Sequence, residues 1–409
     1  MEYKLIQKEK LALASIFFTF FVDNLCWSIV FPIFAPFFLD SRNLIFSPEV
    51  SSATRTTILG FFLAAFPAAQ FFGATLIGDY ADRKGRKKAF FYTILFSIVG
   101  LVLTAISIHL KLISLLFISR LISGVFSGNL SICLTAIADL SHNEYSRVKN
   151  FGYLAAIAGS SFIIGVFLGG WFSDAAINSY FNPAFPIWIA AGLTIVNLFF
   201  IIFFFRETRH PHEHLEFDFL EGIHNIQKVL KTKNIKVIYM TYFLFLFSWN
   251  ILLQFTPVQV VEFFQFTNIE IGYVASFMGI CWALGSGILN KLFIKKFQPL
   301  KVFEICLMFF TLFCVLVIFP KHLIGLLVIL GLGVCTAGIA WPICTNVISA
   351  AAGKDIQGKI LGMSQSVQSL AMTLSPLVAV FTHIHPSVPF LSAACSSLIA
   401  VIVYFKIKI

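Results

Sequence analysis

The chain has 409 residues; 58 % of them are hydrophobic, only 12 % are charged, and the formal net charge is +10. Soluble proteins are about half apolar and about a quarter charged, so this composition excludes an ordinary water-soluble protein and favours helices embedded in lipid. A positive charge can signal a nucleic-acid partner, but membrane topology explains where the charges lie in this chain. We therefore expect no nucleic-acid partner.

Apolar runs of about 20 residues, long enough to cross a bilayer as helices, recur along the chain. They predict twelve spans, near residues 11–39, 56–78, 89–109, 112–138, 150–173, 184–205, 236–262, 270–293, 301–319, 322–349, 358–382 and 388–406. The predicted fold is an all-α membrane protein with twelve transmembrane helices. The first run is too long for a cleaved signal peptide, and no small-residue cleavage site ends it, so we expect it to remain as the first span.

The basic residues are distributed unevenly between the two sides of the membrane. Of the 29 Lys and Arg residues, 24 fall on the side that carries both termini, four fall on the other side, and Arg120 lies inside a span. Because cytoplasmic loops collect Lys and Arg, this distribution predicts that both termini are cytoplasmic. We expect a multi-pass protein of the cytoplasmic (inner) membrane of a bacterium.

The longest polar stretch divides the chain into two halves of six spans each. It predicts an N-terminal half at 1–205, a cytoplasmic linker at 206–235 and a C-terminal half at 236–409. Apolar residues recur at helical spacing within the linker, which indicates an amphipathic helix on the membrane face. Two pseudo-symmetric halves would place a binding site near the midplane of the bilayer.

No residue pattern in the chain requires a metal or a cofactor. His210, His212 and His214 alternate in the linker and offer a conceivable metal site, but no Cys or Asp completes it, so we expect a solvated segment. All eight cysteines fall in apolar spans and none forms a CxxC pair, so we interpret them as small buried residues. We therefore expect neither a metal site nor a cofactor.

Two charged residues lie deep inside the predicted spans. Asp23 is about twelve residues into the first span, roughly 18 Å from its cytoplasmic start, at a depth where a charge costs at least about 2.5–3.5 kcal/mol. Arg120 lies in the fourth span. The two residues can form a structural ion pair, or they can line one polar cavity. A carboxyl group at this depth can also load and release a proton, as a proton-coupled carrier requires, and we favour this role for Asp23.

The segment GDYADRKGRKKAF, residues 78–90, concentrates seven charges between the second and third spans. It resembles the loop signature of the major facilitator superfamily, usually written GxLADRxGRK, with Tyr80 in place of Leu. The fourth span resembles that family's lxxxRxxxGxxxG pattern, with Arg120 at its basic position. The first span and the loop before the fifth resemble segments of the 12-span drug:proton antiporters and tetracycline exporters. The fifth span resembles the antiporter motif that ends GPxxGG, but Val166 replaces its proline.

This resemblance implies roles for the charged loop and for Arg120. It implies a conformational latch on the cytoplasmic side, formed by Gly78, Asp82, Arg83, Gly85, Arg86, Lys87 and Asp139. Asp82 would face the N-terminus of the eleventh span near Gly358, and Gly85 would supply a tight turn. The alternative is that the basic residues only set topology. The resemblance also implies that Arg120 takes part in proton coupling.

Polar and aromatic residues at matching depth are candidates for lining a substrate cavity. They are Asn24, Trp27, Asn129, Trp249, Asn250, Gln254, Trp282, Trp341, Asn346, Gln365 and Gln368. The alternative is that several of them make hydrogen bonds between helices or anchor spans at the membrane interface.

The sequence favours a proton-coupled secondary transporter that works by alternating access and exports a small amphipathic compound. Proton symport that imports a metabolite or siderophore is the alternative, and Val166 strengthens it. A polytopic enzyme or a structural protein is a further alternative, but His and acidic residues do not cluster as catalysis requires, and no Walker loop is present. We expect no enzymatic activity. The expected partners are a small-molecule substrate, protons and the lipid bilayer, and the expected functional state is a monomer.

Overall fold

The computed structural model describes residues 2–39, 45–47, 49–141, 144–208, 233–319, 322–350 and 357–405. Every regular element in these ranges is a helix. The elements are α1 (Glu2–Ser28), α2 (Phe31–Leu39), α3 (Ser52–Lys84), α4 (Arg86–Leu110), α5 (Ile113–Val125), α6 (Asn129–Leu140), α7 (Glu144–Ser173), α8 (Phe185–Phe204), α10 (Lys233–Phe264), α11 (Asn268–Ala283), η2 (Leu284–Leu289), α12 (Asn290–Lys296), α13 (Pro299–Leu316), α14 (Leu323–Ala350), α15 (Gln357–Leu374), η4 (Ser375–His383) and α16 (Val388–Phe405).

Eleven helical segments of the described residues are long and apolar enough to cross a membrane. They coincide with eleven of the predicted spans. The remaining predicted span, 358–382, is divided between α15 and the 3₁₀ segment η4, which begins at Ser375-Pro376. The predicted all-α membrane fold is confirmed. The predicted linker helix and its three histidines lie outside the described residues.

Four spans of the described residues break or change helix type along their length, and the eleventh, from α15 to η4, is one of them. The first breaks between α1 and α2, where Pro32 lies in the first turn of α2 and supplies no N–H. The fourth breaks between Val125 and Asn129, next to Gly128. The eighth passes from α11 through the π-helix η2 into α12. Interrupted helices are tolerated at membrane depth where protein surrounds the backbone.

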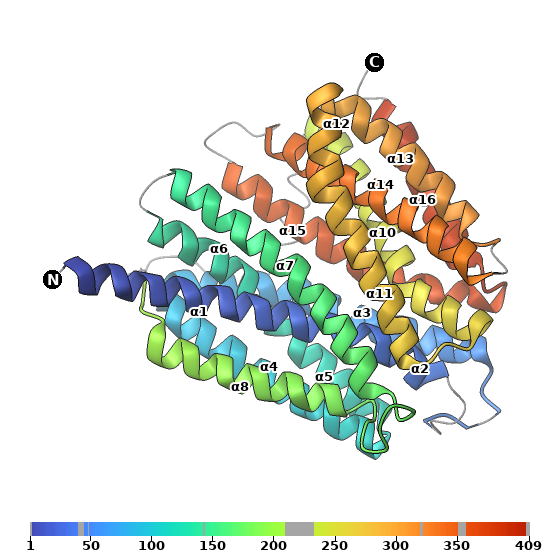
Figure 1. Ribbon diagram of the computed structural model, residues 1–409, viewed down its shortest axis with the longest axis horizontal. Coiled ribbons are helices and arrows are strands. Elements are labelled where there is room, and N and C mark those ends of the chain that lie inside the picture. Colours follow the sequence, from blue (N-terminus) through green and yellow to red (C-terminus); the bar gives the residue numbers. More distant parts are fainter. Residues whose placement is uncertain are drawn as a thin grey trace. The chain divides into compact units, whose positions relative to one another are not determined.

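Unit 1 comprises Met1–Ile33 and Ala68–Leu220. Within it, α1 packs against α7 and α8, and α4 packs against α8 and α5 (Figure 1). Gly165 and Gly169 of α7 permit the close approach to α1, since a Cβ atom on either would overlap Ser28 Oγ or the Ile29 carbonyl oxygen.

Unit 2 comprises Phe34–Pro67 and Glu221–Ile409. Here α10 packs against α16 and α15, α13 packs against α14 and α16, and α11 packs against α14 (Figure 1). The first part of α3 packs against η4, where the Thr57 hydroxyl donates to the Ala379 carbonyl oxygen at 3.2 Å. Phe34–Pro67 therefore clusters with the second half of the chain, and the boundaries at 205 and 235 stay a prediction.

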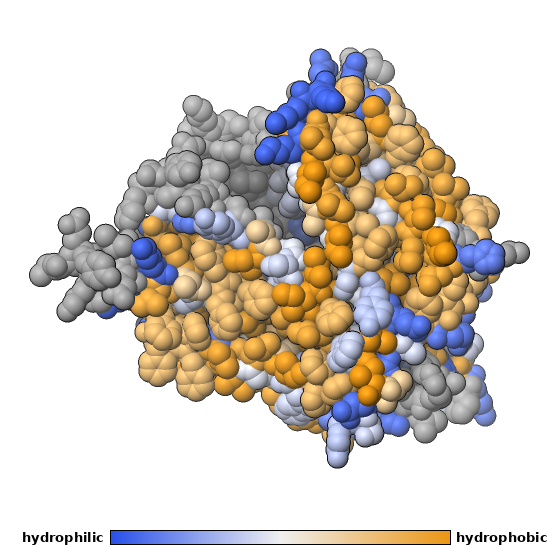
Figure 2. Space-filling view, in the orientation of Figure 1, coloured by the Kyte–Doolittle hydropathy of each residue, from blue (hydrophilic) through white to orange (hydrophobic). Residues whose placement is uncertain are grey.

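Large apolar side chains cover the sides of the helices. Phe203 is 72 % exposed and Ile324 is 77 % exposed, and many other large hydrophobic residues are also exposed. In the face shown in Figure 2, hydrophobic residues cover the helix flanks, and hydrophilic residues gather near α12, which carries Lys291, Lys295 and Lys296. Surfaces of this kind face lipid in a membrane protein.

Candidate functional site

Asp23 lies on α1 in unit 1, half-buried, beside the first residue of α6. The Asn129 side chain interacts with its carboxyl group. The Asn129 amide nitrogen is buried and makes no other hydrogen bond within the described residues, so the Asp23 carboxyl group is its available acceptor. The thiols of Cys26 and Cys133 lie close enough to experience the Asp23 charge.

A hydroxyl group on α4 orients the Asn129 side chain. Thr93 Oγ1 donates a hydrogen bond to Asn129 Oδ1, and both residues are buried. A primary amide has one carbonyl oxygen and one NH₂ group. Because Thr93 engages the oxygen, the NH₂ group is left for Asp23. Three helices therefore set the environment of one carboxyl group.

Two further polar contacts join α1 to α8 on either side of Asp23. Thr19 Oγ1 donates to Asn197 Oδ1 at 2.8 Å, and Cys26 Sγ lies 3.5 Å from Thr194 Oγ1. Thr19, Asp23 and Cys26 follow each other at the spacing of one helix face. We call Thr19, Asp23, Cys26, Thr93, Asn129, Thr194 and Asn197 the polar seam. Sequence reasoning found only Asp23 and Asn129 of this set, although the spacing on α1 could have indicated Thr19 and Cys26 as well.

Arg120 lies on α5 and is 8 % exposed. The neighbouring Ser119 hydroxyl lies 2.9 Å from the Thr104 hydroxyl of α4. Asn129, which contacts Asp23, comes nine positions later and after the helix break. The structure thus places an asparagine beside Asp23, and the pairing of Arg120 with Asp23 stays a prediction.

An aromatic group lies one turn along α1 from Asp23. Trp27 packs on Phe31 and Phe162, with ring centroids 4.9 and 5.9 Å away. The side-chain amide of Asn24 donates to the Phe20 carbonyl oxygen of its own helix at 2.9 Å. Trp27 is therefore the better candidate of the two for contacting a substrate.

In unit 2 the structure separates the predicted cavity residues into different environments. Trp249, Trp282 and Trp341 come together from three helices. Asn250 is buried, and its side-chain amide donates to the Leu246 carbonyl oxygen of the same helix at 2.7 Å. This amide group is therefore engaged within its own helix. Gln368 is half-buried on α15. The side chains of Asn346 and Gln365 lie outside the part that the structure describes.

At the predicted latch, a carboxylate from beyond α8 caps the N-terminus of α4. Glu207 accepts hydrogen bonds from the backbone N–H of Arg86 at 2.8 Å and of Lys87 at 3.1 Å. The N-cap residue Gly85 has φ of 98°. The first N–H groups of a helix lack internal partners and form the positive end of its dipole, which favours a carboxylate there. Sequence reasoning missed Glu207.

The Arg86 side chain points to a second carboxylate. Its Nε atom lies 3.7 Å from Asp139 Oδ2, and the Thr208 hydroxyl donates to the same oxygen at 3.3 Å. Lys87 Nζ donates to the Ile202 carbonyl oxygen at 2.8 Å. These contacts tie the start of α4 to the ends of α6 and α8. We call Gly85, Arg86, Lys87, Asp139, Glu207 and Thr208 the loop cluster.

Three further residues of the predicted latch, Gly78, Asp82 and Arg83, belong to α3. Gly78 lies in α3 with nothing within 4 Å of the position that a Cβ atom would take. Arg83 is half-buried near the end of the same helix. The Asp82 side chain lies outside the described part, so its contact with the eleventh span stays a prediction.

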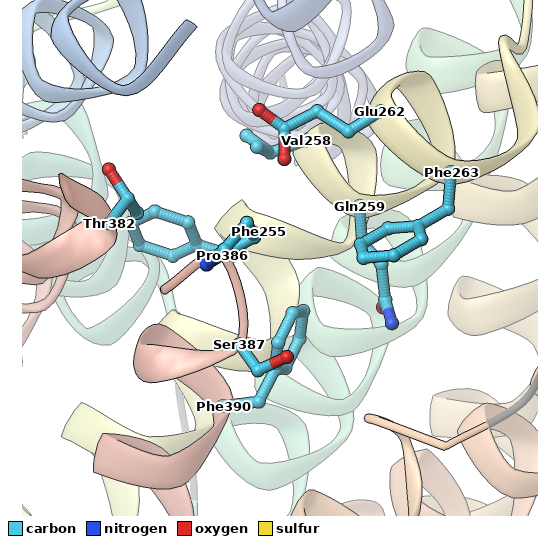
Figure 3. A pocket seen from close by; sticks show the side chains of 9 residues that line it. All are labelled: Phe255, Val258, Gln259, Glu262, Phe263, Thr382, Pro386, Ser387 and Phe390. Atoms are coloured by element: carbon cyan, nitrogen blue, oxygen red, sulfur yellow. The ribbon is translucent and has the colours of Figure 1, made fainter. Parts of the chain in front are cut away.

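A small pocket in unit 2 lies between the end of α10 and the segment from η4 to α16 (Figure 3). Its lining residues are Phe255, Val258, Gln259, Glu262, Phe263, Thr382, Pro386, Ser387 and Phe390. Gln259 donates to the Val317 carbonyl oxygen at 2.9 Å, and Glu262 accepts from the Ser52 hydroxyl at 2.8 Å. None of the predicted substrate residues lines this pocket.

These features define a class of protein. Discontinuous spanning helices, a carboxyl group held at membrane depth and a charged loop between spans are the features of a polytopic membrane carrier. Groups of His, Cys, Asp and Glu that could hold a metal ion do not occur among the described residues. Residues 16–376 match the family model described as Major Facilitator Superfamily, and the chain belongs to that family of transporters, which are not enzymes.

Curated relatives cover most of the chain. It is 24 % identical over 338 residues to the class H tetracycline resistance protein of Pasteurella multocida, which covers 82 % of this chain and 81 % of that protein. It is 25 % identical over 355 residues to the quinolone resistance protein NorA of Staphylococcus aureus, which covers 84 % of this chain and 86 % of that one. The predicted family resemblance is confirmed.

Solved structures share the fold. The D-xylose-proton symporter superposes with a TM-score of 0.74 at 15 % identity, covering 97 % of this chain and 98 % of that one. The human organic anion transporter MFSD10 superposes with a TM-score of 0.72 at 20 % identity, covering 97 % and 99 %. At sequence identities of 15 and 20 %, the structural similarity shows that the fold is shared.

Proposed function

We propose that this transporter couples proton movement to the export of a small amphipathic compound by alternating access. The single observation that carries the proposal is Asp23, a carboxyl group at membrane depth whose partner is the neutral amide of Asn129. A carboxylate held by a neutral donor can accept a proton without breaking an ion pair, so its charge can change during a transport cycle. The tetracycline and quinolone resistance proteins among its relatives support export.

Protonation of Asp23 would act on the contact between α1 and α6. The ionised carboxylate accepts a charge-assisted hydrogen bond from the Asn129 NH₂ group, and such bonds are roughly twice as strong as neutral ones. A proton on the carboxyl group weakens this bond. Because Thr93 holds the Asn129 oxygen in place, the change falls on the position of α1. Arg120, a buried charge on α5, would contribute to the electrostatic potential at the seam.

The loop cluster supplies the rigidity that rocking motion needs. Glu207 and Asp139 hold the cytoplasmic ends of α4, α6 and α8 together, so these helices would move as one piece. Asp82 would then latch this piece to the N-terminus of α15 in the outward-open state. We infer that both termini are cytoplasmic, that the protein lies in the cytoplasmic membrane of a bacterium, and that the monomer is the functional unit.

Import by proton symport is the second candidate. The observation that favours it is Val166, which is fully buried in the unbroken helix α7 at the position where the antiporter motif has proline. Proline there would remove a backbone hydrogen bond and bend the helix.

Export by proton antiport and import by proton symport can be distinguished in proteoliposomes in which the orientation of the protein is known. Substrates are first identified by counterflow exchange without a pH gradient, and a gradient of either sign is then imposed. An antiporter accumulates substrate in the compartment from which protons leave, and a symporter accumulates it in the compartment that protons enter. Exchange that no pH gradient alters would contradict proton coupling altogether.

A further inference from the structure

Three of the six tryptophans of the chain meet in unit 2. Trp249 of α10 and Trp282 of α11 have ring centroids 4.4 Å apart and an interplanar angle of 33°. Trp341 of α14 lies 6.3 Å from Trp282, with its ring inclined at 52°. The first two indoles therefore pack against each other at a tilt, and the third ring stands at a steeper angle beside Trp282. We call these three residues the tryptophan site.

The backbone around Trp282 is built to hold this ring against α14. Immediately after Trp282 and Ala283, the chain enters the π-helical turn η2, a geometry frequent at functional sites. A Cβ atom on Gly338 of α14 would lie 2.8 Å from the Trp282 carbonyl oxygen, so glycine permits the close approach there. Asn290 Nδ2 then donates to the Ile339 carbonyl oxygen at 2.8 Å. Both contacts fall on the turn of α14 that precedes Trp341 and fix its approach to the eighth span.

All three indoles remain partly exposed, although they lie in the middle of long apolar helices. On the same helix as Trp249, five positions later, the Gln254 Oε1 atom is buried and accepts no hydrogen bond from the described residues. Packed cores normally bury aromatic rings of this size. Partly exposed indoles offer a surface that the flat apolar face of a ligand can contact.

The charged residues of the helices that carry these tryptophans indicate which class of ligand fits the tryptophan site. Between Lys236 and Glu262 the helix α10 has no charged residue, and α14 has none along its length. An anion would find no counter-charge in these segments. A cation is attracted by the negative face of an indole ring, and tryptophan is the best of the aromatic side chains for this interaction.

We propose that the tryptophan site binds the planar aromatic ring of a cationic substrate. The inference deepens the proposed function, on which it rests, by naming the substrate class. The partly exposed indoles of Trp249 and Trp282 provide ring faces for stacking and for the cation, and Trp341 bounds the site beside Trp282.

The test measures binding and requires no transport. Purified full-length protein in lipid nanodiscs is dialysed at pH 7 against 9-aminoacridine, a planar aromatic cation, and separately against tetrabutylammonium, an aliphatic cation. The wild type should bind 9-aminoacridine at least tenfold more tightly than tetrabutylammonium. Trp282→Ala and Trp249→Ala should each weaken acridine binding about tenfold, because stacking and cation–π contacts are lost. Trp282→Phe keeps a ring and should lose less than threefold.

Trp171→Ala is the matched control. Trp171 is 36 % exposed in unit 1 and packs on Phe167, so its loss should leave acridine binding unchanged. Failure of the wild type to bind 9-aminoacridine, or wild-type affinity in Trp282→Ala, would overturn the inference. Equal losses for both cations would also overturn it, because they would indicate a general change in structure. If acridine binds as expected but no pH gradient drives transport, the proposed coupling fails and the tryptophan site stands.

Discussion

The Glu207 carboxylate accepts a hydrogen bond from the backbone N–H of Arg86 at 2.8 Å, and its second oxygen accepts one from Lys87 at 3.1 Å. This contact joins a residue in the segment after α8 to the first turn of α4, 120 positions away. It satisfies two N–H groups that a helix start leaves unpaired. The charged loop is thus stabilised by a carboxylate that is not part of the loop motif.

Replacing this carboxylate should destabilise the loop cluster. Glu207→Gln keeps the shape but removes the negative charge at the positive end of α4, and the loss should be about 0.5–2 kcal/mol. Thermal unfolding of the purified protein measures it. Glu270→Gln is the comparison: it also removes a charge at a helix start, but Glu270 lies in an exposed capping box of α11, where glutamine is accepted, so its unfolding temperature should change less. Equal shifts in both variants would remove the special role of Glu207.

The two glycines of the loop motif should respond differently to alanine. Gly85 has φ of 98°, and a Cβ atom there would overlap the Glu207 carboxylate, so Gly85→Ala should cost about 1–3 kcal/mol and impair transport. Gly78 lies in a regular helix with nothing within 4 Å of a Cβ position, so Gly78→Ala should be neutral or stabilising by about 0.4–1 kcal/mol. Comparable transport defects in both variants would mean that Gly78 has a role in another conformational state.

Thr93 should influence proton coupling through Asn129. Thr93→Val preserves volume but leaves the Asn129 oxygen without its donor, at a cost of about 1–3 kcal/mol. The freed amide can then rotate away from Asp23, so the pH dependence of transport should shift. Thr104→Val is a matched control on the same helix, because it breaks the buried Thr104–Ser119 contact far along α4 from Asp23. It should destabilise similarly without moving the pH profile, and a shared shift would refute the polar seam.

The contact between α1 and α7 depends on glycine. Gly169→Ala would place a methyl group against the Ile29 carbonyl oxygen at the α1–α2 break, and such overpacking costs about 1–3 kcal/mol. Gly159→Ala introduces the same atom into open space on the same helix and should be tolerated. Unfolding temperatures in one detergent compare the pair directly. An unchanged unfolding temperature for Gly169→Ala would contradict this, because it would mean that α1 and α7 can move apart without loss of stability.

The spans and their class were predictable because lipid imposes a strong local rule. Every spanning helix needs a long apolar run, and this signal is visible in one sequence without knowledge of packing. The weakest prediction was the eleventh span, where Ser375-Pro376 changes the helix type to 3₁₀. The motif loop was also visible, because its charges stand out in an apolar chain.

The site was predictable only in part, because depth in the membrane does not specify which helix faces meet. Their position along the predicted spans put Trp249, Trp282 and Trp341 at a similar depth in the membrane. Whether the three rings meet depends on the π-turn and on Gly338, which the sequence pattern does not reveal. The same criterion of depth made Asn250 a candidate for the cavity, but its side-chain amide donates to the Leu246 carbonyl oxygen of its own helix. Glu207 escaped notice because it follows a span as an ordinary polar residue, and only tertiary structure brings it to α4.

The most direct test of the account is pH-driven transport by Asp23→Asn in proteoliposomes. Asparagine keeps the size of the side chain but binds no proton in the transport range. We expect that accumulation driven by a pH gradient is lost in this variant, while substrate exchange at equal pH partly persists. Asp174→Asn, which replaces a buried acid of unit 1 outside the polar seam, should retain both activities. Full pH-driven accumulation by Asp23→Asn would contradict the central claim that this carboxyl group carries the proton.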